Sequence, residues 1–327
     1  MKTALITTTV NVPVVLQLYR KLDPSVFFFV AADRKTPLEA YQMCADISDC
    51  EIYSPDRQTE LGYECSPLIG WNTIARRNIA LLEALRWGAD VIVTIDDDNI
   101  PTGNSKWMSY AWDFESVIDQ PWSGLEATSA SGWFDVGTLL DPVSPHRGFP
   151  HTKASPPIFK SVVDARIGVA AGICLGDPDI SAITRIANAP TVHRVSELLR
   201  AGIVTDPRVT RTVFNSQNTA FIRDLASCFL MVPQFGRYDD IFASLVAQRR
   251  MAERNLYVHF GQPFVWQQRN EHDLLKDLAA EQWGAENILD IAEMLDAAKP
   301  SEKILVGVSG LRELVDAWEA DIKKVMG

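Results

Sequence analysis

The sequence predicts an α/β protein with a mostly parallel sheet, helices flanking it and a C-terminal helical annex. Three observations support this prediction. From residue 3 to residue 95, short β-branched runs alternate with helical patterns, which is the order of elements in a parallel sheet. The run V-I-V-T-I at 91–95 lacks the alternation of a half-exposed strand and is typical of a strand covered on both faces. After residue 271 the pattern is helical, so we expect a main domain at 1–270 and an annex at 271–327.

Turn and capping residues set the expected element boundaries. The predicted strands are 3–8, 26–32, 51–53, 90–95 and 256–260, and the predicted helices are 12–22, 37–45, 71–87, 192–201, 238–253, 273–298 and 301–325. Between 122 and 211, Gly, Pro and Ser are more frequent and, outside the helix at 192–201, the periodicity weakens. We therefore expect long functional loops in this middle region.

Composition excludes several classes of protein. The net charge of −11 opposes binding to a phosphate backbone, so we expect no nucleic-acid partner. No apolar run approaches the roughly 20 residues that span a bilayer. The five cysteines show no C-x-x-C spacing, which favours a reduced, cytoplasmic protein without a disulfide framework or structural zinc. The sequence leaves open whether the chain forms a homo-oligomer.

Three adjacent carboxylates, Asp96, Asp97 and Asp98, follow the apolar strand at 90–95. Like charges this close raise one another's pKa unless a cation or hydrogen-bond donors offset the repulsion. A helix N-cap or a solvated turn is one alternative. A Walker-B acid is weakened because the chain has no G-x-x-x-x-G-K-[ST] motif, and an EF-hand lacks its Gly and distal Glu.

The remaining reading of the triplet is an Asp-x-Asp metal site. A hard divalent cation, Mn²⁺ or Mg²⁺, would take oxygen ligands from Asp98, and from Asp96 through water or ribose. The cation would bridge the two phosphates of a nucleotide diphosphate and neutralise the charge that develops on that leaving group.

Seven motifs in a fixed order carry a family resemblance. They are T-I-D-D-D (94–98), F-D-V-G-T-L-L-D-P (134–142), H-R-G-F-P (146–150), G-I-C-L-G-D-P-D-I-S-A-I-T (172–184), N-S-Q-N-T-A-F (215–221), G-R-Y-D-D-I-F-A (236–243) and G-Q-P-F-V-W (261–266). In these motifs the sequence resembles the reversibly glycosylated polypeptides, or UDP-arabinopyranose mutases. That resemblance implies a GT-A-like, Rossmann-like fold and a UDP-sugar substrate.

The sequence departs from that family pattern at the last motif. The family usually has a histidine, a metal ligand in GT-A folds, directly after the final Trp, and here Gln267 stands in its place. We take His272 as the replacement candidate for a metal ligand. Ser181 stands where the family commonly has an acid, so the sugar specificity is expected to differ as well.

The resemblance also assigns catalytic residues. Arg147 corresponds to the arginine that the family reversibly glycosylates. A guanidinium stays protonated and is a poor nucleophile, however, so the alternative roles of Arg147 as a phosphate clamp or an ion-pair partner have nearly equal weight. Asp239 and Asp240 correspond to acids that hold sugar hydroxyls or act as a base. Their alternative role is N-capping of the helix that follows.

The remaining candidates are contacts to the nucleotide. Arg76 or Arg77 would reach the diphosphate, or both would be surface residues. The ends of the first two strands supply further candidates by fold analogy. The complete set of nucleotide-contact candidates is Thr8, Asn11, Asp33, Arg76, Arg77, Asp96 and Asp97.

These expectations combine into one functional hypothesis with two rivals. The preferred hypothesis is a metal-dependent UDP-sugar enzyme that interconverts pyranose and furanose forms, with domain 1–270 holding the nucleotide sugar. One rival is a GT-A glycosyltransferase that passes the sugar to a separate acceptor. The other is a non-catalytic nucleotide-sugar-binding subunit, which the departure at Gln267 would favour.

Overall fold

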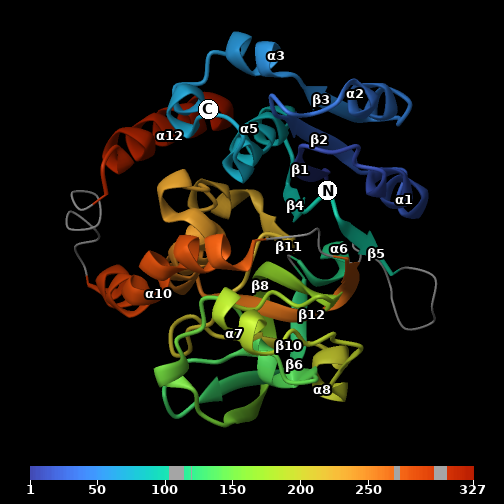
Figure 1. The fold of residues 1–327 in the computed structure, drawn as a ribbon. Helices are drawn as coiled ribbons and strands as arrows, with labels where there is room; N and C mark the ends of the chain where they lie inside the picture. Colours follow the sequence, from blue (N-terminus) through green and yellow to red (C-terminus); the bar gives the residue numbers. More distant parts are fainter. Residues whose placement is uncertain (103–113, 119, 269–272, 298–307) are drawn as a thin grey trace.

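The computed structural model of the chain describes residues 1–102, 114–118, 120–268, 273–297 and 308–327. These residues form a mixed α/β fold around one large sheet, with helices packed on both of its faces (Figure 1). The predicted α/β class is therefore confirmed, whereas the finer assignment to a GT-A fold stays a prediction.

The strands and helices have the following bounds. The strands are β1 (Thr3–Thr9), β2 (Phe27–Ala32), β3 (Cys50–Tyr53), β4 (Val91–Ile95), β5 (Asn99–Pro101), β6 (Pro121–Ser129), β7 (Leu140–Asp141), β8 (Pro157–Gly176), β9 (Arg194–Val195), β10 (Ile203–Thr205), β11 (Asn218–Ile222) and β12 (Leu256–Gln267). The α-helices are α1 (Val15–Leu22), α2 (Leu38–Ala45), α3 (Pro55–Glu60), α4 (Cys65–Ile69), α5 (Arg77–Trp87), α6 (Phe114–Val117), α7 (Ala182–Ala187), α8 (Glu197–Ala201), α9 (Asp239–Glu253), α10 (Leu274–Asp296) and α12 (Leu311–Met326). Short 3-10 turns include η1 (Ile74–Arg76), η5 (Arg223–Cys228) and η6 (Pro233–Tyr238).

The N-terminal half of the sheet is parallel. Its strands lie in the order β3-β2-β1-β4, and the β1–β2, β2–β3 and β1–β4 pairs all run parallel. The strand order reverses between β1 and β4, which makes a crevice outside the carboxyl ends of these two strands. Ligands bind at such a point in open α/β sheets.

The C-terminal half of the sheet is mixed, so the prediction of a mostly parallel sheet holds only for the first half. β11 runs antiparallel to both β4 and β8. Beyond it, β8, β6, β10 and β12 are joined by a closed cycle of pairings, two of them parallel and two antiparallel. This second half is the lower part of the molecule in Figure 1.

The middle region contains long strands instead of the predicted loops. β6 and the 20-residue β8 both fall inside it. Gly168 and Gly172 interrupt the strand pattern of β8, and glycine weakens a strand signal. Gly172 has a packing reason, because a Cβ there would lie 2.4 Å from the Asn218 side chain. The predicted helix at 192–201 is only partly present, since β9 occupies its start and α8 its end.

Two hydrophobic clusters fill the two faces of the parallel half. Leu5, Phe28 and Val30 point to the face that α1 covers, in a cluster with Leu16 and Tyr19. Residues one position away along the same strands point to the opposite face, under α5. This alternation is the side-chain period of a strand, and it buries the strands on both faces.

The C-terminal helices pack onto the rest of the fold. Leu314, Trp318 and other residues of α12 join the larger hydrophobic cluster, and α12 packs on α4 and α5. α10 lies against η6, α7 and α9. The first part of the predicted helix at 301–325 lies outside the described residues.

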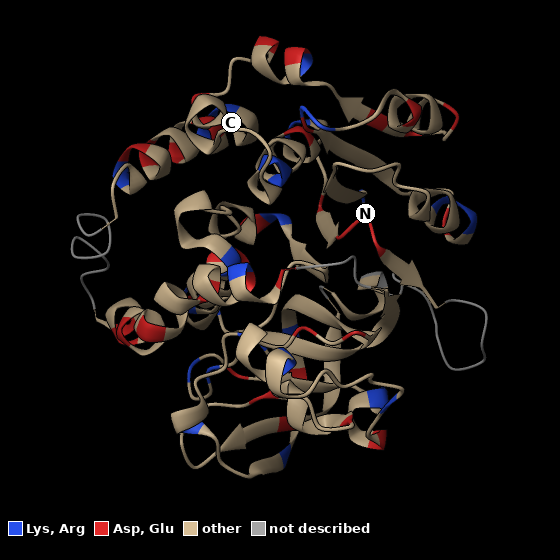
Figure 2. Ribbon diagram, viewed as in Figure 1, with Lys and Arg blue, Asp and Glu red and all other residues tan. Residues whose placement is uncertain are grey.

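Charged residues lie mainly on the helices and connecting segments, and the strands are largely uncharged (Figure 2). Within the described ranges, no helix has both the length and the apolar character needed to span a bilayer.

Candidate functional site

A cleft of about 210 Å³ opens beside the carboxyl end of β4. It brings together residues from seven separate parts of the chain. Its lining residues are Ile74, Asp96, Asp98, Arg147, Asp179, Ser216, Gln217, Gly236, Arg237, Asp239, Asp240 and Gln267. Five of the residues singled out from the sequence as site candidates therefore line one cavity.

The three carboxylates after β4 have different environments. Asp96 Oδ1 accepts a hydrogen bond from Arg77 Nη2 at 2.6 Å. Asp97 Oδ2 accepts one from Thr9 Oγ1 at 2.5 Å, at the carboxyl end of the neighbouring strand. Asp98 Oδ1 is buried, and no described residue donates a hydrogen bond to it. Of the three, Asp98 therefore has an unsatisfied oxygen.

The pKa of Asp98 reflects this environment. Burial raises it, and the charges of Asp96 and Asp97 raise it further, to about 7. A buried acceptor without a donor is costly, and either a proton or a cation would satisfy it. Asp98 is therefore the carboxylate of the triplet best suited to bind an added positive charge.

Gln267 lies beside Asp98 because the end of β12 pairs with β5, which places Gln267 opposite Asn99. The Gln267 side chain lies close enough to Asp98 to lower its pKa, which partly offsets the effect of burial, and its Oε1 accepts a hydrogen bond from Gln217 Nε2 at 3.2 Å. A glutamine therefore occupies the position at which the family resemblance implies a histidine ligand. The replacement candidate His272 lies outside the described residues.

The oxygen donors of this corner suit a hard cation in part. Asp96, Asp98 and Gln267 all face the cleft, and Asp98 Oδ1 has a free lone pair. Within the part of the chain that the structure describes, no group of three or more His, Cys, Asp and Glu side chains is arranged to hold a metal ion. A bound cation would need further ligands, which phosphate oxygens and water provide in nucleotide sites.

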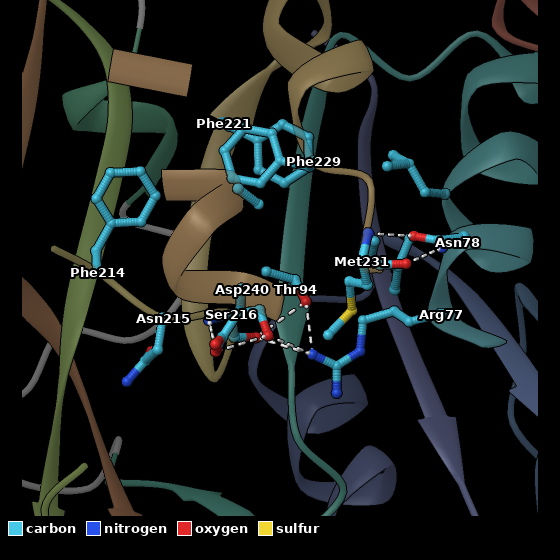
Figure 3. Close-up of a pocket in the computed structure, with 13 residues that line it drawn as sticks. Arg77, Asn78, Thr94, Phe214, Asn215, Ser216, Phe221, Phe229, Met231 and Asp240 are labelled. Atoms are coloured by element: carbon cyan, nitrogen blue, oxygen red, sulfur yellow. Dashed lines mark hydrogen bonds between the residues drawn. The ribbon is translucent and has the colours of Figure 1, made fainter. Parts of the chain in front are cut away.

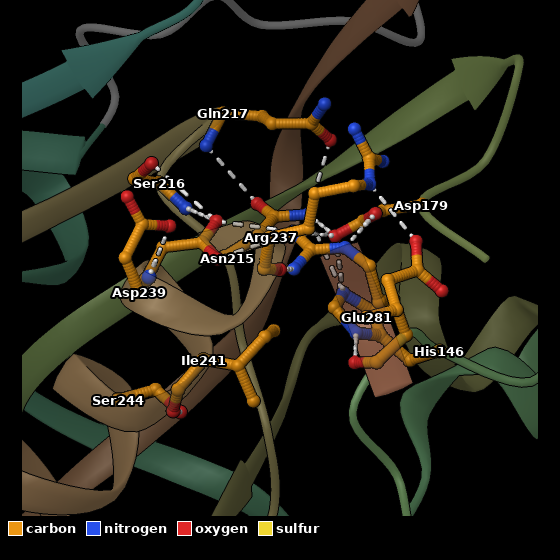
Figure 4. A network of polar contacts seen from close by, with 12 residues as sticks. His146, Asp179, Asn215, Ser216, Gln217, Arg237, Asp239, Ile241, Ser244 and Glu281 are labelled. Atoms are coloured by element: carbon orange, nitrogen blue, oxygen red, sulfur yellow. Dashed lines mark hydrogen bonds and ion pairs between the residues drawn. The ribbon is translucent and has the colours of Figure 1, made fainter. Parts of the chain in front are cut away.

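Arg147 is buried and lies at the centre of an ion-pair network with Asp179 and Asp240. Figure 4 shows Asp179 and other polar residues of this network. Its Nε and Nη2 donate to the two oxygens of Asp179 at 2.8 and 3.0 Å. Nη2 also contacts both oxygens of Asp240 at 3.2 Å, and Nη1 donates to the backbone carbonyl of Arg237. Every nitrogen of the guanidinium is therefore engaged.

These contacts fix the charge state of the network. Burial alone would lower the pKa of Arg147, but Asp179 and Asp240 outweigh it and hold the pKa well above the ordinary value. Burial would raise the pKa of Asp179, whereas Arg147 and His146 hold that pKa well below its usual range. Arg147 is thus a permanent cation and an ion-pair partner, which was one of the alternatives from the sequence.

Asp239 and Asp240 are the first two residues of α9 and are buried in the cleft wall. The N-cap residue of α9 is Tyr238, so neither aspartate has the N-capping role that the sequence left open. Asp239 Oδ1 accepts a hydrogen bond from the backbone amide of Asp240 at 2.8 Å. Asp240 Oδ2 accepts one from the Ser216 amide at 3.2 Å. Burial and the neighbouring charge of Asp240 raise the pKa of Asp239 to about 7. Asp239 can therefore both give and take a proton near neutral pH.

Arg77 supports Asp96 from behind the cleft. Besides its bond to Asp96, its Nη1 donates to Thr94 Oγ1 at 3.1 Å and to the backbone carbonyl of Ser216 at 3.1 Å, beside a cavity of about 20 Å³ (Figure 3). Arg77 is 3% exposed. It lies behind the cleft lining, so its contact is to the acidic triplet and the predicted direct contact to a diphosphate needs correction.

Arg76 has a structural role, which also corrects its assignment as a diphosphate contact. Its side chain is fully buried and donates to Gln58 Oε1 at 2.6 and 2.9 Å and to the Ser66 carbonyl at 2.9 Å. The η1 turn directs the two adjacent arginines to different surroundings. The spacing in the sequence gave no sign of which of the two would face the acidic strand.

The other nucleotide-contact candidates lie at the same edge of the sheet but outside the cleft lining. Thr8 Oγ1 donates to the Ala31 carbonyl at 2.6 Å. Asp33 is buried and accepts hydrogen bonds from the amides of Asn72 and Thr73 at 2.8 and 3.1 Å. Asn11 is exposed, its backbone amide donates to Thr9 Oγ1 at 3.0 Å, and its side chain lowers the pKa of Asp97. These residues order the loops around the crevice between β1 and β4.

Sequence reasoning missed two charged residues of the cleft, Asp179 and Arg237. Both fall inside motifs that carried the family resemblance, G-D-P-D-I-S and G-R-Y-D-D. The sequence did contain a signal for both residues in their positions within these motifs. Asp179 is the second acid of its motif, and Arg237 directly precedes Tyr238 and the acidic pair Asp239 and Asp240. Neither residue had a partner close in sequence that would have indicated its role.

Comparison of the chain with protein-family models gives no match, and comparison with curated proteins gives no significant match.

Proposed function

We propose that the protein is a nucleotide-sugar enzyme, a UDP-sugar pyranose–furanose mutase. One observation supports this most strongly: a single cleft at the carboxyl end of β4 combines an unsatisfied carboxylate, a carboxyl that titrates near neutral pH and a buried cation. The crevice between β1 and β4 has the topology at which α/β sheets bind nucleotides. The identity of the nucleotide as UDP rests on the family resemblance.

A divalent cation, Mn²⁺ or Mg²⁺, belongs to this proposal. Asp98 would hold it, with Asp96 and Gln267 as neighbouring oxygen donors in the cleft wall. When bound, such a cation neutralises the charge of the diphosphate leaving group. The buried, uncompensated Asp98 Oδ1 is the feature of this chain that favours its presence.

The proposed reaction breaks two bonds at the anomeric carbon and forms two. The bond to the β-phosphate oxygen breaks and its electron pair leaves with UDP. A different sugar hydroxyl then bonds to the anomeric carbon, the bond to the original ring oxygen breaks, and the UDP oxygen re-attacks the anomeric carbon. That hydroxyl loses a proton and the former ring oxygen gains one, so no net proton is consumed. Asp239, whose pKa is raised to about 7, is suited to accept the first proton and return the second.

Arg147 is proposed to act through the carboxylates that it orders. A protonated guanidinium has no lone pair with which to attack a sugar, and Asp179 and Asp240 hold Arg147 in that form. The Asp240 carboxyl group, paired with Arg147, is suited to stabilise the positive charge that develops at the anomeric carbon. We therefore propose that the glycosyl unit is held between carboxylates without a covalent bond to Arg147.

The engagement of every Arg147 nitrogen also favours a second candidate function. If no protein group accepts the sugar, a separate acceptor molecule is the natural destination, and the enzyme would then be a glycosyltransferase. The cleft would bind the same UDP-sugar in both cases, so the outcome without an acceptor separates the two functions.

The test is an incubation of the purified protein with a panel of UDP-sugars and with Mn²⁺ or Mg²⁺, without acceptor. Chromatography of the nucleotide sugars would detect a ring isomer, and UDP release would detect hydrolysis. The mutase proposal predicts an isomer that depends on the metal. Sugar transfer that requires an added acceptor, with no isomer formed, would replace the mutase with the glycosyltransferase.

A further inference from the structure

Among the charged residues that the structure describes along the cleft, Arg237 is the accessible cation. Five aspartates and two arginines of the described ranges line the cavity. Arg147 is 6% exposed and its guanidinium is saturated by protein acceptors. The side chain of Arg237 is 24% exposed, so its guanidinium can be reached from solvent.

Arg237 uses only part of its donor capacity within the protein. Its Nε donates to Glu281 Oε1 at 2.9 Å, and its Nη1 lies 3.5 Å from Asp277 Oδ1. No described residue accepts a hydrogen bond from Nη2. A guanidinium has five N–H donors in a planar fork, so several donors of Arg237 remain available for a ligand.

Arg237 lies on η6, and contacts with helix α10 hold its side chain in place beside the cleft. Glu281 is buried, and its second carboxylate oxygen accepts a hydrogen bond from the Ala182 amide at 2.7 Å, which fixes its position. Gly236 has a φ of 56°, and a Cβ there would lie 2.8 Å from the Ala280 carbonyl, so glycine is required for the close approach to α10. The anchored Glu281 therefore sets the direction in which the Arg237 fork points (Figure 4).

An anionic substrate needs such a group. A diphosphate that enters a cavity lined by five aspartates meets repulsion unless cations face it. Arginine donates two parallel hydrogen bonds to phosphate oxygens and is the residue best suited to this contact. The partly open Arg237 fork meets this requirement, whereas the Arg147 fork does not.

We infer that Arg237 is the phosphate-binding residue of the cleft, and that Glu281 on α10 positions it for a nucleoside diphosphate. This inference rests on the proposed function for the nature of the substrate. It assigns to the C-terminal segment a part in substrate binding, through one buried carboxylate.

The experiment measures the binding of UDP, uridine and inorganic pyrophosphate by titration calorimetry in the presence of Mg²⁺. Arg237→Gln should weaken UDP and pyrophosphate binding by about 10- to 100-fold, the usual effect of losing hydrogen bonds to a charged group, and leave uridine binding unchanged. Arg237→Lys keeps the charge without the fork and should recover part of that affinity. Arg208→Gln removes an arginine outside the cleft, paired with Asp206, and should change nothing.

Glu281→Gln separates ligand binding from a structural ion pair. If Arg237 only stabilises the fold, Glu281→Gln and Arg237→Gln break the same pair and should lower all affinities alike. If Arg237 binds phosphate, Glu281→Gln keeps the cation and also keeps a side-chain oxygen that can accept from Arg237 Nε, so the fork stays in position and UDP should bind within about threefold of the wild type.

Each outcome decides the inference. Loss of UDP and pyrophosphate affinity in Arg237→Gln but not in Glu281→Gln supports it. Unchanged affinity in Arg237→Gln, or equal losses in both variants, overturns it. A wild type that binds pyrophosphate through Arg237 but not UDP would uphold the anion site and refute the proposed nucleotide-sugar function, and a wild type that binds neither would overturn both.

Discussion

The Arg147 network gives the sharpest prediction about stability. Arg147→Met removes the guanidinium while keeping an apolar side chain of comparable length. Asp179 and Asp240 are then left as buried carboxylates without their cation. Breaking a buried ion pair in this way costs about 3–5 kcal/mol of unfolding free energy. The matched control is Arg208→Met, which breaks an equally bidentate ion pair with Asp206. The Arg208 side chain is 40% exposed, so the loss of this pair should lower the unfolding free energy by less than about 1 kcal/mol.

The pH dependence of the Arg147 variant identifies the cause of the loss. In the wild type, the depressed pKa of Asp179 contributes stability that is present above the unfolded pKa of about 3.9 and is lost as pH falls through the folded value. In Arg147→Met the pKa of Asp179 should rise, because burial is no longer opposed. Urea unfolding should therefore show a larger stability difference from the wild type at pH 7 than at pH 5. Equal costs for the two arginine variants, or a difference independent of pH, would refute the reasoning.

The other predictions concern single residues of the cleft and its support. Asp239→Asn should abolish isomerisation yet raise the unfolding free energy at pH 8 by on the order of 2 kcal/mol. The reason is that the raised pKa of Asp239 makes its ionisation destabilising as pH rises from about 4 to 7. Urea unfolding at pH 4 and pH 8 checks this prediction, and an equal change in unfolding free energy at both pH values would contradict it. Asp98→Asn should lower turnover by at least about 100-fold and weaken Mg²⁺-dependent UDP binding, while circular dichroism shows an intact fold. An unchanged metal dependence would disprove the assignment of Asp98 as a metal ligand. Gly284→Ala should destabilise the protein by about 1–3 kcal/mol in thermal unfolding, because its Cβ would lie 2.1 Å from the Tyr238 ring, and an unaltered melting temperature would show that α10 can shift.

The sequence predicted the parallel half of the fold well because its signals are local. The strand predicted at 90–95 contains the run V-I-V-T-I, and β4 spans that run, Val91–Ile95. Asp96 and Asp98 follow directly at the carboxyl end of that strand, where ligands of α/β folds bind, and both line the cleft. Here a short stretch of sequence determines both the element and the position of its side chains.

The second half was harder to predict because its determinants lie far apart in the chain. β8 contains glycines whose reason is contact with other strands, so its own pattern gave a weak signal. Asp179 and Asp240 are 32 and 93 positions from Arg147, and only the fold brings them to one guanidinium. The pKa values raised by burial at Asp98 and Asp239 likewise arise from packing, which no spacing in the sequence records.

The most direct test of the proposed function follows the oxygen that links the sugar to the diphosphate. A UDP-sugar carrying ¹⁸O in the bond between the anomeric carbon and the β-phosphorus is incubated with the enzyme and a divalent metal, without acceptor, and is examined by ³¹P NMR. Reversible cleavage and rotation of the β-phosphate should move the label from the bridging to the non-bridging positions in the wild type and leave it in place in Asp98→Asn. A label that stays in the bridging position during incubation with active wild-type enzyme would contradict the mutase account.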